Sequence, residues 1–259
     1  MMLNIAWVYP DILNLHGDRG NIMALSKIAE AMGIEANITK INYGDTIDFD
    51  NTDLIFMGAG QLRDVTHVVK NMSAWEDNIK DYVEKGGYVL AIGSTGCVLG
   101  KKLTIEGGDT VDGLGVLDIT AKELCRTKMP YVTKEVYGDD IWWNYKDMEI
   151  LGNQIQRVDY TLGDVKPLGE VMYGYGNNLG GQEGARYNNV LLTNTVGPLL
   201  SSNPWFGADL LSEIMESKGE KVSTDLEKLE FLDYAKEAAV LRKKFIKEKF
   251  KLPGIIHKA

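Results

Sequence analysis

The chain of 259 residues has few of the residues that build metal sites and disulfide frameworks. It contains two cysteines, Cys97 and Cys125, and three histidines, His16, His67 and His257. Two cysteines in a chain of this length do not form a disulfide framework and are typical of a reducing compartment, which predicts a cytoplasmic protein. Three scattered histidines do not supply a histidine-rich metal site, so neither a metal nor a cofactor is expected.

Long apolar runs and positive charge are also scarce. No hydrophobic run approaches the length of a membrane-spanning helix, and residues 1–9 lack the basic start and the small-residue cleavage site of a signal peptide. Lys and Arg total 28 against 37 Asp and Glu, which gives a net charge of −9. Such an acidic chain is a poor general binder of nucleic acid or anionic membrane, so neither partner and no membrane insertion is expected.

The composition that remains is that of a globular α/β protein, with 44% hydrophobic and 25% charged residues. In the first hundred residues, short apolar runs alternate with segments of helical periodicity. These patterns predict strands at 4–8, 35–41, 54–57 and 88–92 and helices at 18–32 and 73–84. Gly33 is expected to end the first helix. Ser73 is expected to cap the second, with Glu76 as its capping-box partner.

Strands and helices that alternate with short connections predict a parallel sheet covered by helices on both faces. Ligands of such sheets bind at the carboxyl ends of the strands. Two glycine-containing turns, at 58–61 and 93–96, follow predicted strands and are therefore the expected place for a site.

The rest of the chain has a different character. Residues 103–192 are rich in Gly, Val, Tyr and Thr and predict short strands and turns, and residues 224–251 predict one long helix. We expect one domain over 1–217 and a helical extension over 218–259, packed on the same domain or on a partner.

The turn after the strand at 88–92 has the pattern of a nucleophile elbow, a sharp strand-to-helix turn that exposes one side chain at a helix N-terminus. An active elbow carries Cys or Ser at its apex, but this chain has Gly93 there. Ser94 and Thr95 are expected to cap the helix that follows. Cys97 lies one helical turn further on and is the alternative nucleophile, although a buried, inert thiol is its simpler interpretation.

These residues and several flanking motifs resemble the class I glutamine amidotransferase domains of the cobyric acid synthase (CobB/CobQ) type. Within that group they most resemble the GatD-type amidotransferase subunit of lipid II isoglutaminyl synthase. The resemblance is carried by residues 9–11, 13–21, 58–64, 113–118, 174–178, 183–184, 197–200 and 203–204. It implies a three-layer, flavodoxin-like fold with a mixed, mainly parallel sheet, helices on both faces and a C-terminal helical tail.

The chain departs from this family at the residues that do the chemistry. Gly93 stands where the family has its nucleophilic cysteine, and Val196 stands where it has its catalytic histidine. Hydrolysis of glutamine needs a thiolate to form a thioester and a base to take its proton, and neither side chain can do this. His67 is the one histidine considered as a relocated base, against the simpler interpretation of a surface helix residue.

Parts of the substrate pocket are nevertheless expected to persist. Gln61 matches a pocket-lining position, Gly60 is a candidate backbone donor, and Arg126 falls where the family has an arginine that holds glutamine. A surface ion pair is the equally weighted alternative for Arg126. Residues 152–154 read Gly-Asn-Gln, where the family has glycine-phenylalanine-glutamate. The substrate pocket and the partner contacts are therefore expected to differ from those of the family.

Three functions follow. The preferred one is a catalytically degraded amidotransferase subunit that partners a Mur-ligase-like, ATP-dependent amidating enzyme acting on a cell-wall precursor. The second is an active glutaminase that supplies ammonia through Cys97. The third is a binding module for an anion, an amino acid such as glutamine, or a related small ligand, held by the free N–H groups at Ser94 and Thr95.

Overall fold

The computed structural model describes residues 1–124 and 136–249. Its centre is a six-stranded sheet in the order β13-β14-β4-β3-β1-β2. The strands are β1 (Met2–Val8), β2 (Glu35–Ile41), β3 (Leu54–Met57), β4 (Tyr88–Ile92), β13 (Ala185–Tyr187) and β14 (Val190–Thr193). Every neighbouring pair is parallel except β13 and β14. The mixed, mainly parallel sheet expected from the sequence is therefore confirmed.

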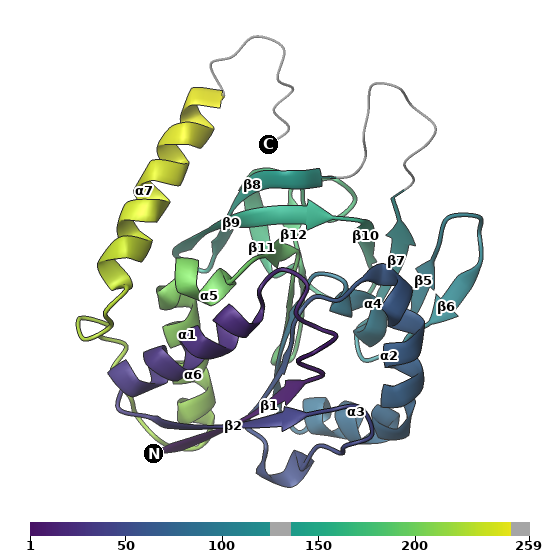
Figure 1. The fold of residues 1–259 in the computed structure, drawn as a ribbon, viewed down its shortest axis with the longest axis horizontal. Coiled ribbons are helices and arrows are strands. Elements are labelled where there is room, and N and C mark those ends of the chain that lie inside the picture. The colour runs from purple at the N-terminus through teal and green to yellow at the C-terminus, as the bar shows by residue number, and fades with distance from the viewer. Residues whose placement is uncertain (125–135, 250–259) are drawn as a thin grey trace.

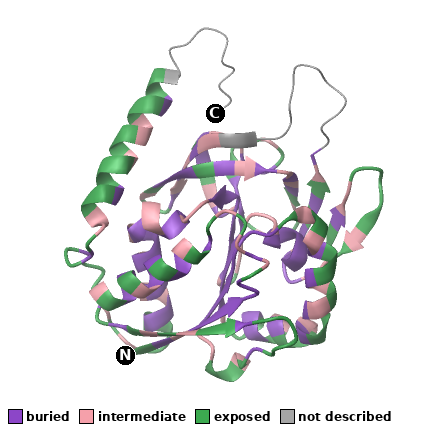
Figure 2. Ribbon diagram, in the orientation of Figure 1, coloured by how far each residue is buried: buried purple, intermediate pink, exposed green. Residues whose placement is uncertain are grey.

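Helices cover both faces of this sheet (Figure 1). One face packs against α1 (Arg19–Ala31) and α6 (Pro204–Ser217), and the other against α2 (Val65–Met72), α3 (Glu76–Glu84) and α4 (Thr95–Leu99). Short 3-10 turns lie at Phe49–Asn51, Leu62–Asp64 and Ser73–Trp75, and α5 spans Leu199–Ser202. β3 and β4 are buried along their whole length, which explains their continuous apolar sequence (Figure 2).

Two smaller sheets stand beyond the carboxyl ends of the central strands. The first has the order β12-β11-β8-β9-β15 and the second the order β10-β7-β5-β6. Their strands are β5 (Lys102–Thr104), β6 (Thr110–Asp112), β7 (Ile119–Glu123), β8 (Val136–Tyr145), β9 (Met148–Gln156), β10 (Val158–Leu162), β11 (Gly169–Tyr173), β12 (Gln182–Glu183) and β15 (Thr195–Val196). The expectation of only short strands in this part was wrong for β8 and β9, which have ten and nine residues.

Two local expectations about helix starts were wrong because side chains found other partners. The helix expected at 73–84 begins as a 3-10 turn, and the hydroxyl of Ser73 donates to the carbonyl of Lys70 over 2.8 Å instead of capping α3. At α4, the hydroxyl of Thr95 donates to the carbonyl of Ile92 over 2.8 Å, and no side chain caps the helix. Gly33 does follow α1 with φ of +75°, as a C-terminal glycine should.

The C-terminal helix α7 (Leu232–Lys249) begins later than the expected residue 224. Ser223 and Asp225 explain part of the delay, because their side chains accept hydrogen bonds from the backbone N–H groups of Asp225 and Glu227. α7 lies along the edge of the molecule (Figure 1), where Ile246 is buried against Leu151 and Tyr173. The helix therefore packs on this chain; the division of the chain at residue 217 stays a prediction.

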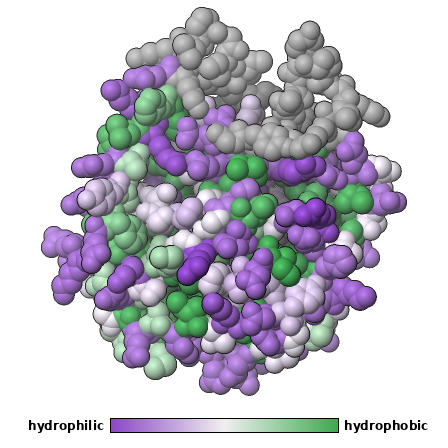
Figure 3. All heavy atoms as spheres, in the orientation of Figure 1, coloured by the Kyte–Doolittle hydropathy of each residue, from purple (hydrophilic) through white to green (hydrophobic). Residues whose placement is uncertain are grey.

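The outer face of α7 is not uniformly polar. Its apolar side chains that are more than half exposed are Tyr234, Val240, Leu241 and Phe245. In the space-filling view, hydrophobic and hydrophilic residues are interspersed over the described part of the face that includes α7 (Figure 3). Among the described residues, no helix combines the length and the apolar character needed to cross a membrane.

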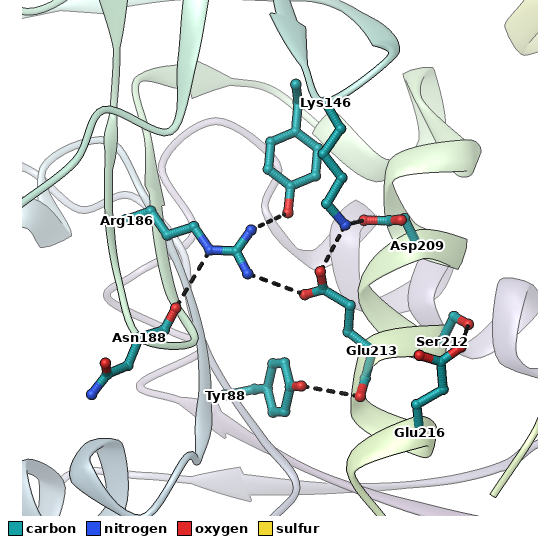
Figure 4. Close-up of polar contacts among 9 residues, drawn as sticks. Tyr88, Lys146, Arg186, Asn188, Asp209, Ser212, Glu213 and Glu216 are labelled. Atoms are coloured by element: carbon teal, nitrogen blue, oxygen red, sulfur yellow. Dashed lines mark hydrogen bonds and ion pairs between the residues drawn. The ribbon is translucent and has the colours of Figure 1, made fainter.

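An ion-pair network joins α6 to the two sheets beside it (Figure 4). The ammonium of Lys146, in the β8–β9 turn, lies 2.6 Å from Asp209 and 2.7 Å from Glu213. The guanidinium of Arg186, on β13, lies 3.5 Å from Glu213 and donates to the phenol oxygen of Tyr145 over 2.9 Å. Partial burial opposes the charge on Lys146, but its two hydrogen bonds outweigh this and raise its pKa. The network fixes the outer sheet relative to the central one.

Candidate ligand pocket at the carboxyl ends of the strands

A cavity of about 530 Å³ lies at the carboxyl ends of the central strands. The segments after β1, β3, β4 and β14 form one side of it, through residues that include His16, Gln61, Ser94 and Asn194. The end of β9 and the start of β10 form the other side, with Gln156 among them. The rule that open α/β sheets place their ligand sites at strand carboxyl ends therefore located this cavity correctly.

Gly93 forms the elbow at the bottom of the cavity. Its φ is +57°, a left-handed value that glycine adopts without strain. Its N–H donates to the carbonyl of Thr193 over 2.7 Å, and its carbonyl accepts from the hydroxyl of Tyr160 over 2.7 Å. The turn thus has the backbone of a nucleophile elbow without a side chain at its apex.

Val196 faces this elbow. A Cβ built on Gly93 would lie 3.5 Å from Cγ1 of Val196, which itself is 3% exposed and lines the cavity. The two positions where the family resemblance places a cysteine and a histidine are therefore neighbours in space. Both are occupied by apolar groups that neither hold nor move a proton.

Ser94 bonds across the cavity floor rather than along its helix. Its hydroxyl donates to the carbonyl of Gly60 over 2.7 Å, and the N–H of Gly60 donates back to the same oxygen over 2.9 Å. The expectation that Ser94 caps α4 was therefore wrong. The backbone N–H of Gly60, expected as a donor to a ligand, is already paired with this hydroxyl.

Cys97 lies beneath the turn and is not among the residues that line the cavity. It is 1% exposed, and burial raises the pKa of its thiol to about 12, so that it carries a proton at neutral pH. Its sulfur lies 3.7 Å from the hydroxyl of Tyr160. Since that hydroxyl donates to Gly93, the thiol is the donor in the contact with Tyr160.

The other predicted site residues are divided between the cavity and the surface. Gln61 lines the cavity. His67 lies exposed on α2, where its backbone carbonyl accepts a hydrogen bond from Tyr43 over 2.6 Å, and it does not line the cavity. Arg126 lies outside the described residues. The histidine that does line the cavity is His16, whose imidazole pKa is lowered by burial.

Two buried carboxyl groups escaped the sequence analysis. Asp18 accepts the N–H of Ala59 over 3.0 Å and so ties the segment after β1 to the turn after β3. Glu183 accepts the hydroxyl of Thr193 over 2.5 Å and the N–H of Asn194 over 2.9 Å. Burial raises the pKa of Asp18 to about 6 and that of Glu183 to about 7. Both groups position segments that line the cavity. In the sequence, they stand out only because they lie in the family motifs at 13–21 and 183–184.

Within the described parts of the chain, 1–124 and 136–249, no group of three or more His, Cys, Asp or Glu side chains is arranged to hold a metal ion. Arg157 lines the cavity near the end of β9 and pairs with Glu123 over 3.0 Å. The walls of the cavity carry both apolar and polar side chains, and its floor is closed by Gly93, Val196 and the Ser94–Gly60 pair.

Comparison with known protein families gives a match over residues 4–204 to the CobB/CobQ-like glutamine amidotransferase domain. The chain belongs to this family. Two relatives are subunit GatD of a glutamine-hydrolysing lipid II isoglutaminyl synthase. The one from Streptococcus pneumoniae is 30% identical over 83% of this chain and 82% of its own length. The one from Staphylococcus aureus is 33% identical over 84% of this chain and 86% of its own length.

Two solved structures share the fold of this CobB/CobQ-like chain. The crystal structure of a glutamine amidotransferase superposes with a TM-score of 0.52 at 17% identity and covers 83% of this chain and 99% of the other. PurLQS from Thermotoga maritima reaches a TM-score of 0.50 at 16% identity. Likeness at this level of identity confirms the predicted fold and says nothing of activity.

Proposed function

We propose that this chain is a non-hydrolysing amidotransferase-like subunit that works with a Mur-ligase-like, ATP-dependent amidating subunit on a lipid II type of cell-wall precursor. The similarity to two GatD subunits supports the assignment to a two-subunit enzyme of lipid II amidation. The proposal that this subunit does not hydrolyse glutamine goes further and rests on the site.

The observation that carries the proposal is the pair formed by Gly93 and Val196. The positions lie in contact, as a thiol and its base must, but offer no nucleophile and no proton acceptor. The paired N–H of Gly60 removes one donor that an oxyanion would need. In this proposal the subunit stabilises or positions its partner, and ammonia for the amide comes from solution.

Cys97 is the alternative nucleophile, and its surroundings do not support that role. A catalytic thiolate needs a depressed pKa and a nearby base, whereas burial holds this thiol protonated. His16 is the histidine on the cavity wall, while Cys97 does not reach the cavity. An active Cys97 would therefore need α4 to rearrange.

Ammonia release from L-glutamine tests the proposal. The full chain is assayed alone and with its ATP-dependent partner, and amide formation is measured with either L-glutamine or ammonium chloride as the nitrogen source. We expect no release of ammonia, and amide formation with ammonium chloride only. If ammonia is released, and if Cys97→Ala abolishes the release while Cys125→Ala does not, the chain is an active glutaminase instead.

A further inference from the structure

Four apolar side chains form a stripe along one exposed side of α7. The members of this α7 stripe are Tyr234, Ala238, Leu241 and Phe245. They are spaced by four, three and four residues, so they lie on the same face of the helix. All four are exposed, and Tyr234, Leu241 and Phe245 leave 75%, 55% and 60% of their surface open to solvent. The α7 stripe is therefore an apolar surface that nothing in the described part of the chain covers.

The stripe is distinct from the face through which α7 packs on the body of the chain. Ala235 and Ile246 are buried on that face, and Ala239 packs against the same cluster as Ile246. With 3.6 residues per turn, Phe245 points about 100° around the helix from Ile246. Because α7 lies at the edge of the molecule (Figure 1), another protein can approach the stripe from the side.

The spacing of the stripe is that of the core positions of a short coiled coil. Ala238 and Phe245 take the a positions of a heptad, and Tyr234 and Leu241 take the d positions. A seam of this kind is complemented by a second helix with a stripe of the same spacing. The side chains in and beside the α7 stripe indicate which helix fits.

The stripe complements itself when a second copy of α7 runs in the opposite direction. Tyr234 and Phe245 lie equally far from the centre of the stripe, and so do Ala238 and Leu241. An antiparallel pair therefore sets Tyr234 against Phe245 of the second copy. It also sets Ala238 against Leu241 of the second copy, so that a small side chain meets a larger one. A parallel pair would set Ala238 against its own copy and leave a gap.

The charges beside the stripe complement each other in the same arrangement. Glu237 and Lys244 flank the stripe on the side turned away from the body, at the g positions of the heptad. Within the described residues, the ion pairs of α7 use Arg242 and Lys243 instead. In an antiparallel pair of helices, g positions face g positions. Glu237 of each copy then meets Lys244 of the other, and the two-fold axis makes this pair occur twice.

We propose that the α7 stripe is a dimerisation surface, and that its occupant is α7 of a second copy of this chain, packed antiparallel about a two-fold axis. Four layers form a small seam at the lower end of specific interfaces, so we expect a dissociation constant of about 10–100 µM. The dimer goes beyond the proposed function and forms whether or not the chain hydrolyses glutamine. It would hold two amidotransferase-like subunits in one particle.

Sedimentation equilibrium of the full chain between about 2 and 500 µM tests the proposal. We expect a monomer at the lowest concentrations and a dimer at the highest. Leu241→Glu places a charge in the seam and should weaken the dimer at least tenfold. Val240→Glu is the matched control, because Val240 is 64% exposed but points about 100° away from Leu241, and it should dimerise as the wild type does. A chain that stays monomeric throughout, or a dimer that Leu241→Glu leaves intact, would overturn the proposal.

Exchanging the two charges tests the direction of the helices. Glu237→Lys and Lys244→Glu, each alone, set like charges opposite each other and should weaken the dimer about three- to tenfold at low salt. The double variant restores both pairs with reversed sign, so we expect it to regain the wild-type affinity within about twofold. All of these side chains are exposed, so the substitutions leave the core of the chain untouched. A double variant weaker than either single variant would contradict the antiparallel register.

The same variants distinguish a second copy from the amidating subunit as the occupant of the stripe. In a binding titration with that subunit, we expect Leu241→Glu to bind as tightly as the wild-type chain. If Leu241→Glu instead weakens this binding at least tenfold while the wild-type chain alone stays monomeric, the stripe belongs to the interface with the amidating subunit and the proposed dimer is wrong.

Discussion

The sulfur of Cys97 lies 3.7 Å from the hydroxyl of Tyr160, on the buried side of the turn that Gly93 begins. The same hydroxyl donates to the carbonyl of Gly93, so it anchors the turn from below. The one cysteine among the described residues is thus part of the packing beneath the elbow.

The reactivity of Cys97 follows from this arrangement. In a Cys125→Ala background, we expect iodoacetamide at pH 7.5 to label Cys97 orders of magnitude more slowly than it labels a free thiol, because the thiol is buried and protonated. Labelling should accelerate to the free-thiol rate in denaturant. Mass spectrometry of timed samples gives both rates, and fast labelling of the native chain would place the thiol in a reactive environment.

Gly93 and Gly96 should respond very differently to alanine. At Gly93, a Cβ would lie 3.3 Å from Ala59 and 3.5 Å from Val196, so Gly93→Ala costs mainly the strain of a positive φ, about 1–2 kcal/mol. At Gly96, a Cβ would lie 2.6 Å from the Tyr160 ring, and overpacking of about 3 kcal/mol should outweigh the gain in helix propensity. Urea unfolding of the two variants measures the difference. An equally small loss in both would mean that Tyr160 can move aside.

Stability should fall as the pH rises from about 4 to about 7, because two buried carboxyl groups have raised pKa values. Glu183 has its pKa raised by burial from 4.5 to about 7 and Asp18 from 3.8 to about 6. A carboxyl whose pKa is higher in the folded than in the unfolded chain stabilises the native state. This contribution is fully present at a pH below the unfolded pKa, and it is lost as the pH rises through the folded pKa. At 1.36 kcal/mol per pKa unit, the contribution of Glu183 is about 3 kcal/mol between pH 4.5 and 8.

Urea titrations at several pH values check this dependence. Glu183→Gln should flatten the pH dependence of the free energy of unfolding in the range 4.5 to 7. The lowered pKa of His16 acts in the opposite direction and is present in both proteins, so the difference between them isolates the carboxyl. A pH dependence that is unchanged in the variant would contradict the assignment to Glu183.

Glu213 joins two cations in the network of Figure 4. Glu213→Gln leaves Lys146 with Asp209 and leaves Arg186 with Tyr145, so we expect a moderate loss of about 1 kcal/mol, as for partly exposed pairs. Glu216→Gln, one turn along α6 and exposed, keeps an oxygen that can accept from the hydroxyl of Ser212 and should be nearly neutral. Thermal unfolding at low and high salt measures both variants. The loss at Glu213 should shrink as salt screens the charges.

The fold was largely predictable because its strands are marked by local signals. The segments at 54–57 and 88–92 are short apolar runs followed by glycine turns. This local pattern is typical of strands that are buried on both faces of a parallel sheet. The start of α3 was not predictable, because the hydroxyl of Ser73 donates a hydrogen bond to the carbonyl of Lys70 instead of capping the helix. Several geometries satisfy a serine equally well, and tertiary packing selects among them.

The site was predictable in place but not in detail. The turns at Gly60 and Gly93 located the cavity, because strand ends of a parallel sheet meet at one edge. The pairing of Ser94 with Gly60 depends on a contact between segments 34 residues apart. No periodicity or spacing encodes such contacts, so they become visible only in three dimensions.

The segment 190–196 takes part in two sheets at once. β14 lies in the central sheet beside β4, while Thr195 and Val196 pair with Gln154 and Asn153 of β9 in the outer sheet. The floor of the cavity and the wall that carries Gln156 are therefore joined by backbone hydrogen bonds rather than by side-chain packing alone. Amide hydrogen exchange at Thr195 and Val196 would therefore report on both sheets. A ligand in the cavity or a partner bound to the outer sheet would change how often this pair of strands opens.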